Sequence, residues 1–335
     1  MMAISRRTLA KTVLALLGGG PRLWRACASV APLLQVDRLV DDFSGTSANN
    51  LSCAYRADAV ILLFSLPIYR RPGVGGGLAA LTEAVHPDRR CLSLRFAGAS
   101  YPDRAAGLDR VGAIHEVVVE RDAAPSEAAY FGVLTSSPEE TIEEGKRSLG
   151  KTGAKWNDYT AIDGHSRCGR TRSAVTHFRL PSPAGSNARI IKHARDHFQA
   201  NPPAWRESHW PSDATGEAPR TFLYALTRAI HSREATTETW YVYNERSYRL
   251  RIEKERDPQQ ALRFTQLGLT SRPDGVLQVR GRIREERGGH PVTFRLWIED
   301  GPKMSLPLRI EFQPRSYLRL AFEVDPKASP LEENL

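Results

Sequence analysis

The chain has 335 residues, of which 41% are apolar and 25% charged, a composition that excludes disordered, collagenous and coiled-coil proteins. Its formal net charge of +9 comes largely from the first 31 residues, which hold five basic side chains and no acidic one. The remaining 304 residues carry 42 basic and 38 acidic side chains, without a basic stripe. The charge pattern therefore predicts no nucleic-acid partner.

The first 28 residues have the three regions of a bacterial secretory signal peptide. Arg6 and Arg7 precede a short apolar stretch, and small residues at 26–28 offer a cleavage point. The run 5–11 is similar to a twin-arginine export signal, and an ordinary secretory signal that contains two arginines is the alternative. The apolar stretch is too short to span a bilayer. We expect a periplasmic or secreted cell-envelope protein with no membrane span.

Three cysteines, Cys53, Cys91 and Cys168, remain after the predicted cleavage. An oxidising compartment permits one disulfide among them, and the sequence leaves all three pairings open. No two of them have the short spacing of a zinc knuckle or a redox CxxC motif. The cysteines therefore predict neither a metal nor a redox cofactor.

Residues 32–180 are predicted to form a β-rich N-terminal lobe, which contains a buried strand in the apolar run 59–64. The glycines at 73–77 follow that strand but lack the third glycine of a dinucleotide-binding motif, because Leu78 stands there. A glycine-rich bend that lets the sheet curl is the expected structure. Residues 181–218 are rich in proline and are interpreted as a connector with one short helix at 190–199.

Residues 219–325 are predicted to combine one amphipathic helix with an antiparallel meander, followed by a tail at 326–335. From residue 240 onward the apolar residues alternate with polar ones, and glycine-containing turns separate the runs. The predicted fold is mainly β (α+β), a curved antiparallel sheet or half-barrel with a few packing helices. Whether the two parts form one domain or two stays open. The residues expected to share one apolar face are Leu296, Ile298, Leu308, Ile310, Leu320 and Phe322.

The C-terminal half resembles exported bacterial proteins known as domain of unknown function 3108. The similarity rests on the helix at 219–228, the hairpin at 240–251, and the motif Trp-Ile-Glu-Asp at 297–300 followed by Leu-Pro-Leu-Arg-Ile at 306–310. It covers roughly residues 170–325. The resemblance implies an extended, curved antiparallel sheet similar to the half-barrels of lipoprotein carriers. It implies no known activity and no catalytic residue.

The segment 163–172 holds the candidate catalytic residues His165, Ser166 and Cys168. In a secreted hydrolase, Ser166 or Cys168 would be the nucleophile and His165 the base. The segment falls short of the GxSxG elbow, because Cys168 replaces the final glycine, and its Cys-to-Arg spacing is too short for a phosphatase loop. Adjacent residues of a strand point to opposite faces, which separates His165 from Ser166. A polar hairpin accounts for the same residues.

Two histidines at helical i, i+4 spacing, His193 and His197, are the candidate metal ligands, with His209 as a third. No glutamate stands where a metalloprotease requires its base. Two histidines on a solvated helix face are the alternative interpretation.

Three aromatic residues, Trp240, Trp297 and Tyr317, are the candidates for binding a ligand. Aromatic side chains on half-buried strands also serve as packing residues, which is the alternative for all three.

The sequence contains no complete catalytic motif, and no cofactor is predicted. We expect a non-enzymatic protein that binds an apolar or amphiphilic ligand such as a lipid, or an envelope protein partner. The alternatives are the secreted hydrolase described above and a structural envelope subunit. An apolar cavity between sheet and helices would favour ligand binding.

The export signal predicts cleavage near Ala28, because small residues at positions 26 and 28 suit signal peptidase. Sequencing the N-terminus of protein recovered from the cell envelope tests this expectation. An intact Met1 on that protein would contradict it.

Overall fold

The computed structural model describes residues 34–40, 43, 48–63, 66–105, 109–122, 124–136, 156–181, 186–208, 218–288, 290–301 and 304–328. These residues belong to one compact unit, 32–335. The predicted signal peptide at 1–28 and most of the predicted tail at 326–335 lie outside the described residues, as does His209.

The first half of the chain forms a meander in which each strand pairs antiparallel with the one before it. Its fourth strand contains three consecutive valines, Val117 to Val119, that are all buried, because helices cover both faces of the sheet there. The strands are β1 (Ala48–Leu63), β2 (Leu66–Val85), β3 (Arg89–Ser100), β4 (Val111–Arg121), β5 (Glu127–Thr135), β6 (Trp156–Arg167), β7 (Arg170–Pro181) and β8 (Arg206–Ser208).

The second half forms another antiparallel meander, as the period-two pattern predicts. Its inward positions carry large apolar side chains, and its outward positions carry arginine and glutamate that pair across the strands. The strands are β9 (Thr236–Tyr243), β10 (Arg246–Arg256), β11 (Val276–Glu285), β12 (Val292–Glu299), β13 (Arg309–Arg315) and β14 (Leu318–Val324).

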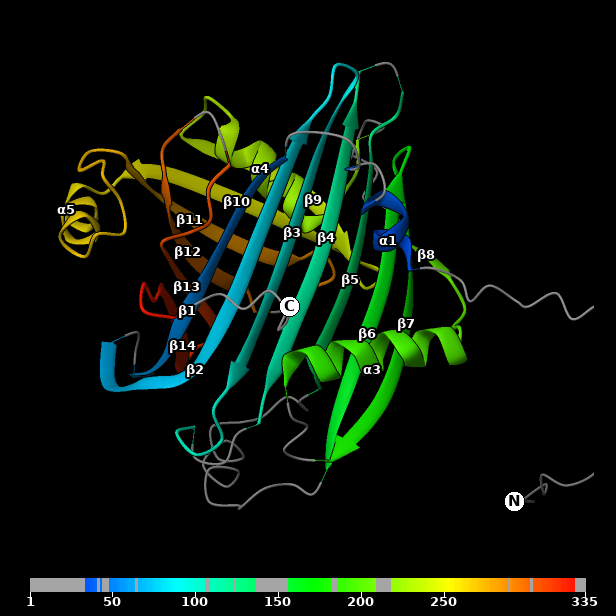
Figure 1. Cartoon of the computed structure of the whole chain (residues 1–335), viewed down its shortest axis with the longest axis horizontal. Coiled ribbons are helices and arrows are strands. Elements are labelled where there is room, and N and C mark those ends of the chain that lie inside the picture. The colour runs from blue at the N-terminus through cyan, green and yellow to red at the C-terminus, as the bar shows by residue number, and fades with distance from the viewer. Residues whose placement is uncertain are drawn as a thin grey trace, which may run out of the picture. The chain divides into compact units, whose positions relative to one another are not determined.

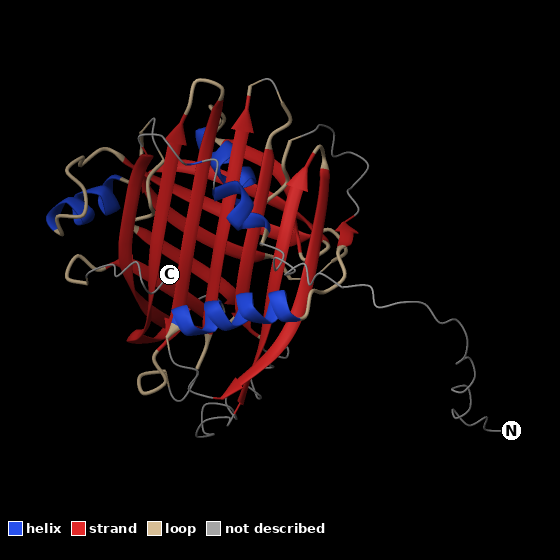
Figure 2. Ribbon diagram, turned by 45° about the vertical axis from the view of Figure 1, so that its right-hand side comes forward, coloured by secondary structure: helices blue, strands red, loops and turns tan. Residues whose placement is uncertain are grey.

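The two meanders join into one 14-stranded sheet, because β14 pairs antiparallel with β1. The strand order is β8-β7-β6-β5-β4-β3-β2-β1-β14-β13-β12-β11-β10-β9. The sheet curls so far that β9–β12 cross behind β1–β7 (Figures 1 and 2). Near its two ends, Arg206 of β8 forms an ion pair with Glu245, in the turn after β9, at 3.6 Å. This nearly closed, barrel-like sheet confirms the predicted fold class.

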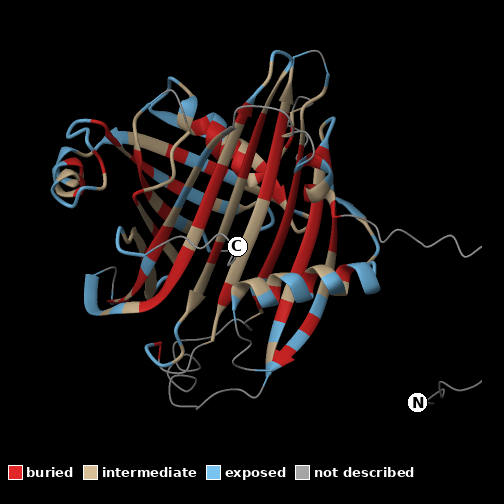
Figure 3. Cartoon of the chain, viewed as in Figure 1, coloured by how far each residue is buried: buried red, intermediate tan, exposed pale blue. Residues whose placement is uncertain are grey.

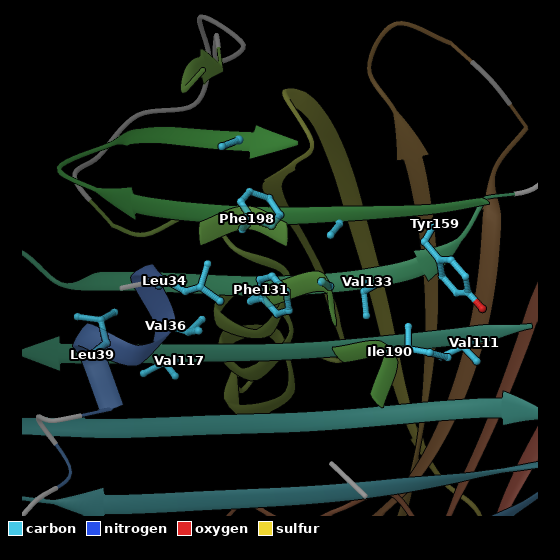
Figure 4. Close-up of a cluster of buried hydrophobic side chains, with 14 of the residues drawn as sticks. Leu34, Val36, Leu39, Val111, Val117, Phe131, Val133, Tyr159, Ile190 and Phe198 are labelled. Carbon is cyan, nitrogen blue, oxygen red and sulfur yellow. The ribbon is translucent and has the colours of Figure 1, made fainter. Parts of the chain in front are cut away.

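Two helices cover the outer face of the N-terminal strands: α1 (Gln35–Val40) and α3 (Asn187–Ala200). Ser186 caps α3 by accepting a hydrogen bond from the amide of Arg189 at 3.3 Å, which explains why the helix begins earlier than the predicted 190. Figure 4 shows the apolar core beneath these helices, which includes Val36, Val117, Phe131, Ile190 and Phe198.

The helix α4 (Phe222–His231) lies inside the curved sheet and is the predicted amphipathic helix. One side of it places Leu223 against Leu81 and Leu92 of the N-terminal half. Its other side packs Ala225, Leu226 and Ala229 against the C-terminal strands. Figure 3 shows buried positions along both the front strands and α4. The helix therefore fills part of the interior and bridges the two meanders.

The predicted apolar face is only partly right. Leu296, Ile298 and Ile310 share the core that surrounds α4. Leu308 instead packs against the outer helix α5 (Pro258–Gln266), because β13 begins only at Arg309 and the alternation does not extend back to residue 308. The side chains of Leu320 and Phe322 are half-buried and lie outside the α4 core.

The α4 core predicts different costs for two isoleucine truncations. Ile252 is fully buried, so Ile252→Ala should lower the free energy of unfolding by about 2–5 kcal/mol. Ile310 only borders the same core and is partly exposed, so Ile310→Ala should cost clearly less. Chemical denaturation of both variants checks the order, and equal losses would contradict it.

Candidate functional site

A cavity of about 350 Å³ lies inside the sheet, beside the C-terminal end of α4. Its polar lining residues stand at the ends of α4, β10 and β12 and in the segment that follows β12, so the cavity is apolar within and polar at one end. The apolar wall consists of Leu81, Leu94, Leu223, Leu226, Ile230, Leu277, Leu296, Ile298, Met304, Leu306 and Pro307. The polar residues are His231, Ser232, Lys254, Glu299, Asp300 and Ser305, and the backbone of Gly301 lies beside them.

The N-terminus of α4 is held by a buried carboxylate from β4. Thr221 occupies the N-cap position but makes no side-chain cap hydrogen bond. Glu116 supplies the missing acceptor, since its Oε1 accepts a hydrogen bond from the amide of Leu223 at 2.8 Å. A carboxylate at this end also favours the helix dipole. The inward position of Glu116 thus fixes where α4 begins.

Burial dominates the titration of this carboxylate. It raises the pKa of Glu116 to about 7, against the opposing effect of the hydrogen bonds that the side chain accepts at the start of α4. The side chain is almost fully inaccessible to solvent. Glu116 therefore changes its charge within the neutral range, at the point where α4 is attached to the sheet.

The C-terminus of α4 is held by a lysine from β10. Lys254 donates from Nζ to the carbonyl oxygen of Ile230 at 2.9 Å and also to that of Ser232. His231 Nδ1 lies 2.9 Å from the carbonyl oxygen of Thr227. A positive charge at this end complements the helix dipole. Lys254 also lines the cavity, so the helix end and the polar end of the cavity share one side chain.

The interior near the N-terminal end of α4 is filled by tyrosines. The rings of Tyr130 and Tyr243 lie 5.3 Å apart, and Tyr241 stacks on Tyr248 at 5.1 Å. A Cβ at residue 164 would collide with the Tyr130 ring, so only glycine fits there. These rings explain why the cavity lies toward the other end of α4.

The structure does not assemble the candidate catalytic residues. Ser166 points inward and is buried, and its Oγ accepts hydrogen bonds from the Thr171 hydroxyl and the Arg220 amide at 3.0 and 2.9 Å. The His165 ring lies on the outer face, with Nε2 2.5 Å from Glu127 Oε1. Cys168 is exposed in the β6–β7 turn at φ 50°. Opposite faces of the sheet therefore separate the proposed base from Ser166.

The candidate metal ligands lie on α3, with the ring centroids of His193 and His197 6.4 Å apart. Both rings contact Phe178, at 5.2 and 5.7 Å. No cluster of three His, Cys, Asp or Glu side chains suited to a metal occurs among the described residues. The contacts with Phe178 give the two histidines a packing role on the sheet.

The candidate ligand-binding aromatics lie away from the interior cavity. Arg249 lies over the Trp240 ring at 4.5 Å. Trp297 is buried beneath α5, where its indole nitrogen donates to Asp257 at 2.9 Å. Tyr317 lies in the β13–β14 turn and accepts a hydrogen bond from the amide of Leu62 at its backbone oxygen. None of the three lines the cavity.

The three cysteines of the described residues lie in three different settings. Cys91 is buried in the outer core, Cys168 is exposed, and Cys53 is half-buried on β1. Burial raises the pKa of the Cys53 thiol.

A second cavity of about 310 Å³ lies on the outer face, where α1 and α3 approach the sheet. Its polar lining includes Arg95, His115 and the ion pair of Arg195 with Asp37, whose closest atoms are 2.8 Å apart. Burial and the two nearby arginines lower the pKa of His115 to about 3, so its ring is neutral. The same burial effect raises the pKa of Asp163, beneath α1, to about 7.

Sequence reasoning missed Glu116 and Lys254, which hold the helix beside the cavity. A signal for Glu116 is present in the sequence, because it is a lone acid at an inward position between Ile114 and Val118. Lys254 carries no comparable signal, since it stands in a run of charged residues. Among the described helices, none is long and apolar enough to cross a membrane.

No protein-family model matches the sequence, and no curated protein matches it. Among solved structures, the chain is similar to a β-barrel-like protein of the domain of unknown function DUF1849 from Brucella abortus. The two share 7% sequence identity with a TM-score of 0.42, and the match covers 84% of this chain and 96% of that chain.

The raised pKa of Glu116 predicts a pH-dependent stability. The folded state favours the protonated carboxyl, so this stabilisation is complete below the ordinary pKa and is lost as the pH rises through about 7. Glu116→Gln keeps a hydrogen-bond acceptor but cannot ionise. Between pH 5 and pH 8 the variant should therefore gain up to about 3 kcal/mol of stability relative to the wild type.

Denaturant unfolding at several pH values measures this difference. Asp163 titrates in the same direction but contributes equally to both proteins. The matched control is Glu238→Gln, at an exposed position, which should keep the pH dependence of the wild type. Parallel curves for Glu116→Gln and the wild type would show that Glu116 does not titrate in this range.

Proposed function

We propose that this protein binds an apolar or amphiphilic ligand in the cavity beside α4. The observation that carries the proposal is the apolar wall of that cavity, to which both halves of the sheet and α4 contribute. The volume of 350 Å³ lies within the range of small-molecule sites, about 300–1,000 Å³, which are mostly apolar with a few polar groups. A site of this kind suits a small amphiphile or one apolar part of a longer lipid.

The polar end of the cavity favours a ligand whose head group has little net charge. Lys254 is already engaged by carbonyl oxygens of α4, and Glu299 accepts a hydrogen bond from Thr270 at 2.6 Å. Asp300 lies 3.4 Å from Arg256. Because each of these charges has a partner, neutral or zwitterionic polar groups fit this end better than a free carboxylate or a free amine.

The predicted signal peptide supports a role outside the cytoplasm, in the periplasm or as a secreted protein. The resemblance of residues 170–325 to domain of unknown function 3108 supports the same setting. In that setting a curved sheet with an apolar interior serves to hold a lipid-like molecule. The alternative is that the protein binds an envelope protein partner instead of a lipid-like molecule.

Filling the cavity should weaken binding without unfolding the protein. Leu94 lines the cavity and is only partly buried, so Leu94→Trp places an indole ring in the cavity space. We expect the affinity for an environment-sensitive apolar dye to fall about tenfold or more, with little change in melting temperature. Fluorescence titration measures the affinity.

The matched control is Leu262→Trp, which adds the same ring at an exposed position of α5 on the outer face. This variant should bind the dye as the wild type does. A wild-type protein that binds neither the dye nor a zwitterionic lysophospholipid would contradict ligand binding and favour a structural role. Equal binding by both variants would place the dye elsewhere on the molecule.

A further inference from the structure

The hairpin between β1 and β2 extends beyond the sheet as an arm, defined here as residues 62–63 and 66–72. The last hydrogen bond of β1 to its other neighbour runs from the Leu62 amide to Tyr317. On the β2 side, pairing with β3 begins only at Gly75. At the far end of the arm Leu63 pairs with Leu66, whereas residues 69–71 pair with β1 residues 59–61 of the sheet. The arm projects at the lower left of Figure 1.

The base of the arm is fixed by a buried aspartate. Asp58 accepts hydrogen bonds from the Arg70 guanidinium at 2.5 Å and from the Gly73 amide at 2.8 Å. Burial alone would raise the pKa of Asp58, but these hydrogen bonds outweigh it and hold the pKa below its ordinary value. Gly73 adopts φ +62°, which favours glycine, beside a register shift between Ala57 and Ala59. The arm is therefore anchored and directed at its base.

The arm presents large apolar side chains to solvent. Leu66 is 68% exposed and Ile68 is 60% exposed, and Leu63 and Tyr69 are exposed to a similar degree. Burial colours in Figure 3 show the same tip as exposed. Exposed apolar side chains that lie together in this way indicate a surface that binds a membrane, a ligand or another protein.

Further exposed apolar residues lie at the same end of the strands. Tyr101 follows β3 and its amide donates to Val74 at 2.8 Å, beside the base of the arm. Leu134 lies near the end of β5 and Trp156 at the start of β6, and both are exposed. Because neighbouring strands alternate in direction, these positions lie at the same end of the strands as the arm. Tyrosine and tryptophan there suit the boundary between water and lipid.

The charge of the arm has one sign. The sequence contains no acidic residue from 59 to 82, whereas Arg70 and Arg71 directly follow the apolar tip. Arg70 is paired with Asp58, which leaves Arg71 for the head groups. An apolar tip followed by a tyrosine and this arginine matches the order of acyl chains, interface and anionic head groups in a bilayer.

We propose that the arm docks this protein on an anionic lipid bilayer, with Leu66 and Ile68 inserted at the interface and Arg71 at the head groups. This surface lies apart from the cavity beside α4, since no residue of the arm lines it. The proposal goes beyond ligand binding and does not depend on it. A protein that takes up or delivers a lipid-like molecule would use such a surface to reach its source.

Flotation with vesicles tests the proposal. The vesicles contain phosphatidylethanolamine with phosphatidylglycerol, and the chains are wild type, Ile68→Glu and the matched control Val85→Glu. Val85 is 64% exposed at the opposite end of β2. We expect Ile68→Glu to lower the vesicle partition coefficient about tenfold or more, because a carboxylate opposes insertion and is repelled by the lipid. Val85→Glu should float as the wild type does.

Replacing the anionic lipid by phosphatidylcholine, or Arg71 by glutamine, tests the charge contribution. Arg71→Gln should lower partitioning on anionic vesicles roughly fivefold. All variants should keep the wild-type melting temperature and the wild-type affinity for the apolar dye, because none of the substituted side chains belongs to the buried core or lines the cavity. A failure of dye binding would therefore contradict the proposed ligand site and not the membrane docking. A failure of flotation would contradict the membrane docking and not the ligand site.

Equal flotation of Ile68→Glu and Val85→Glu would overturn the proposal. Both variants carry the same N-terminal segment, so any vesicle binding by that segment cannot cause a difference between them. Absence of wild-type flotation would overturn it as well. Sedimentation in the absence of lipid identifies the other occupant. If Ile68→Glu converts a wild-type dimer to a monomer and no chain binds vesicles, the arm is an interface between copies of this chain.

Discussion

The position of α4 inside the sheet depends on two polar side chains that hold its two ends. Glu116 of β4 accepts the hydrogen bond at its N-terminus, and Lys254 of β10 donates to the carbonyl oxygens at its C-terminus. The two side chains come from different halves of the chain, so the helix links the two meanders. Both charges agree with the helix dipole, which offsets part of the cost of burying the carboxylate. The cavity remains where this fixed helix ends.

The fold class was predictable because alternation is a local signal. Each C-terminal strand shows period two within its own residues, and α4 shows helical spacing within ten residues. The closure of the sheet was not predictable in this way, because the pairing of β1 with β14 joins segments about 260 residues apart. Likewise, α5 escaped notice, although Asp257 before Pro258 is an ordinary N-terminal signal.

The candidate site was predicted less well than the fold. Sequence reasoning selected residues by chemical type, and the adjacent His165 and Ser166 point to opposite faces of β6. The cavity is lined by common leucines and isoleucines from five elements and a loop, and no single segment of sequence contains enough of them to be recognised. The glycine bend at 73–77 was predictable, because the absence of side chains is a property of the residues themselves.

The junction of β1 with β14 has a consequence for the order of folding. Tyr55 pairs with Val324, so the first strand waits for the last one to be synthesised before its second edge is covered. Such long-range pairing slows folding, since a large loop must close before the contacts form. Until then, the newly made N-terminal meander carries a long open edge of apolar sequence, which is a template for aggregation. The rate at which the C-terminal half is completed therefore controls how long the chain is at risk.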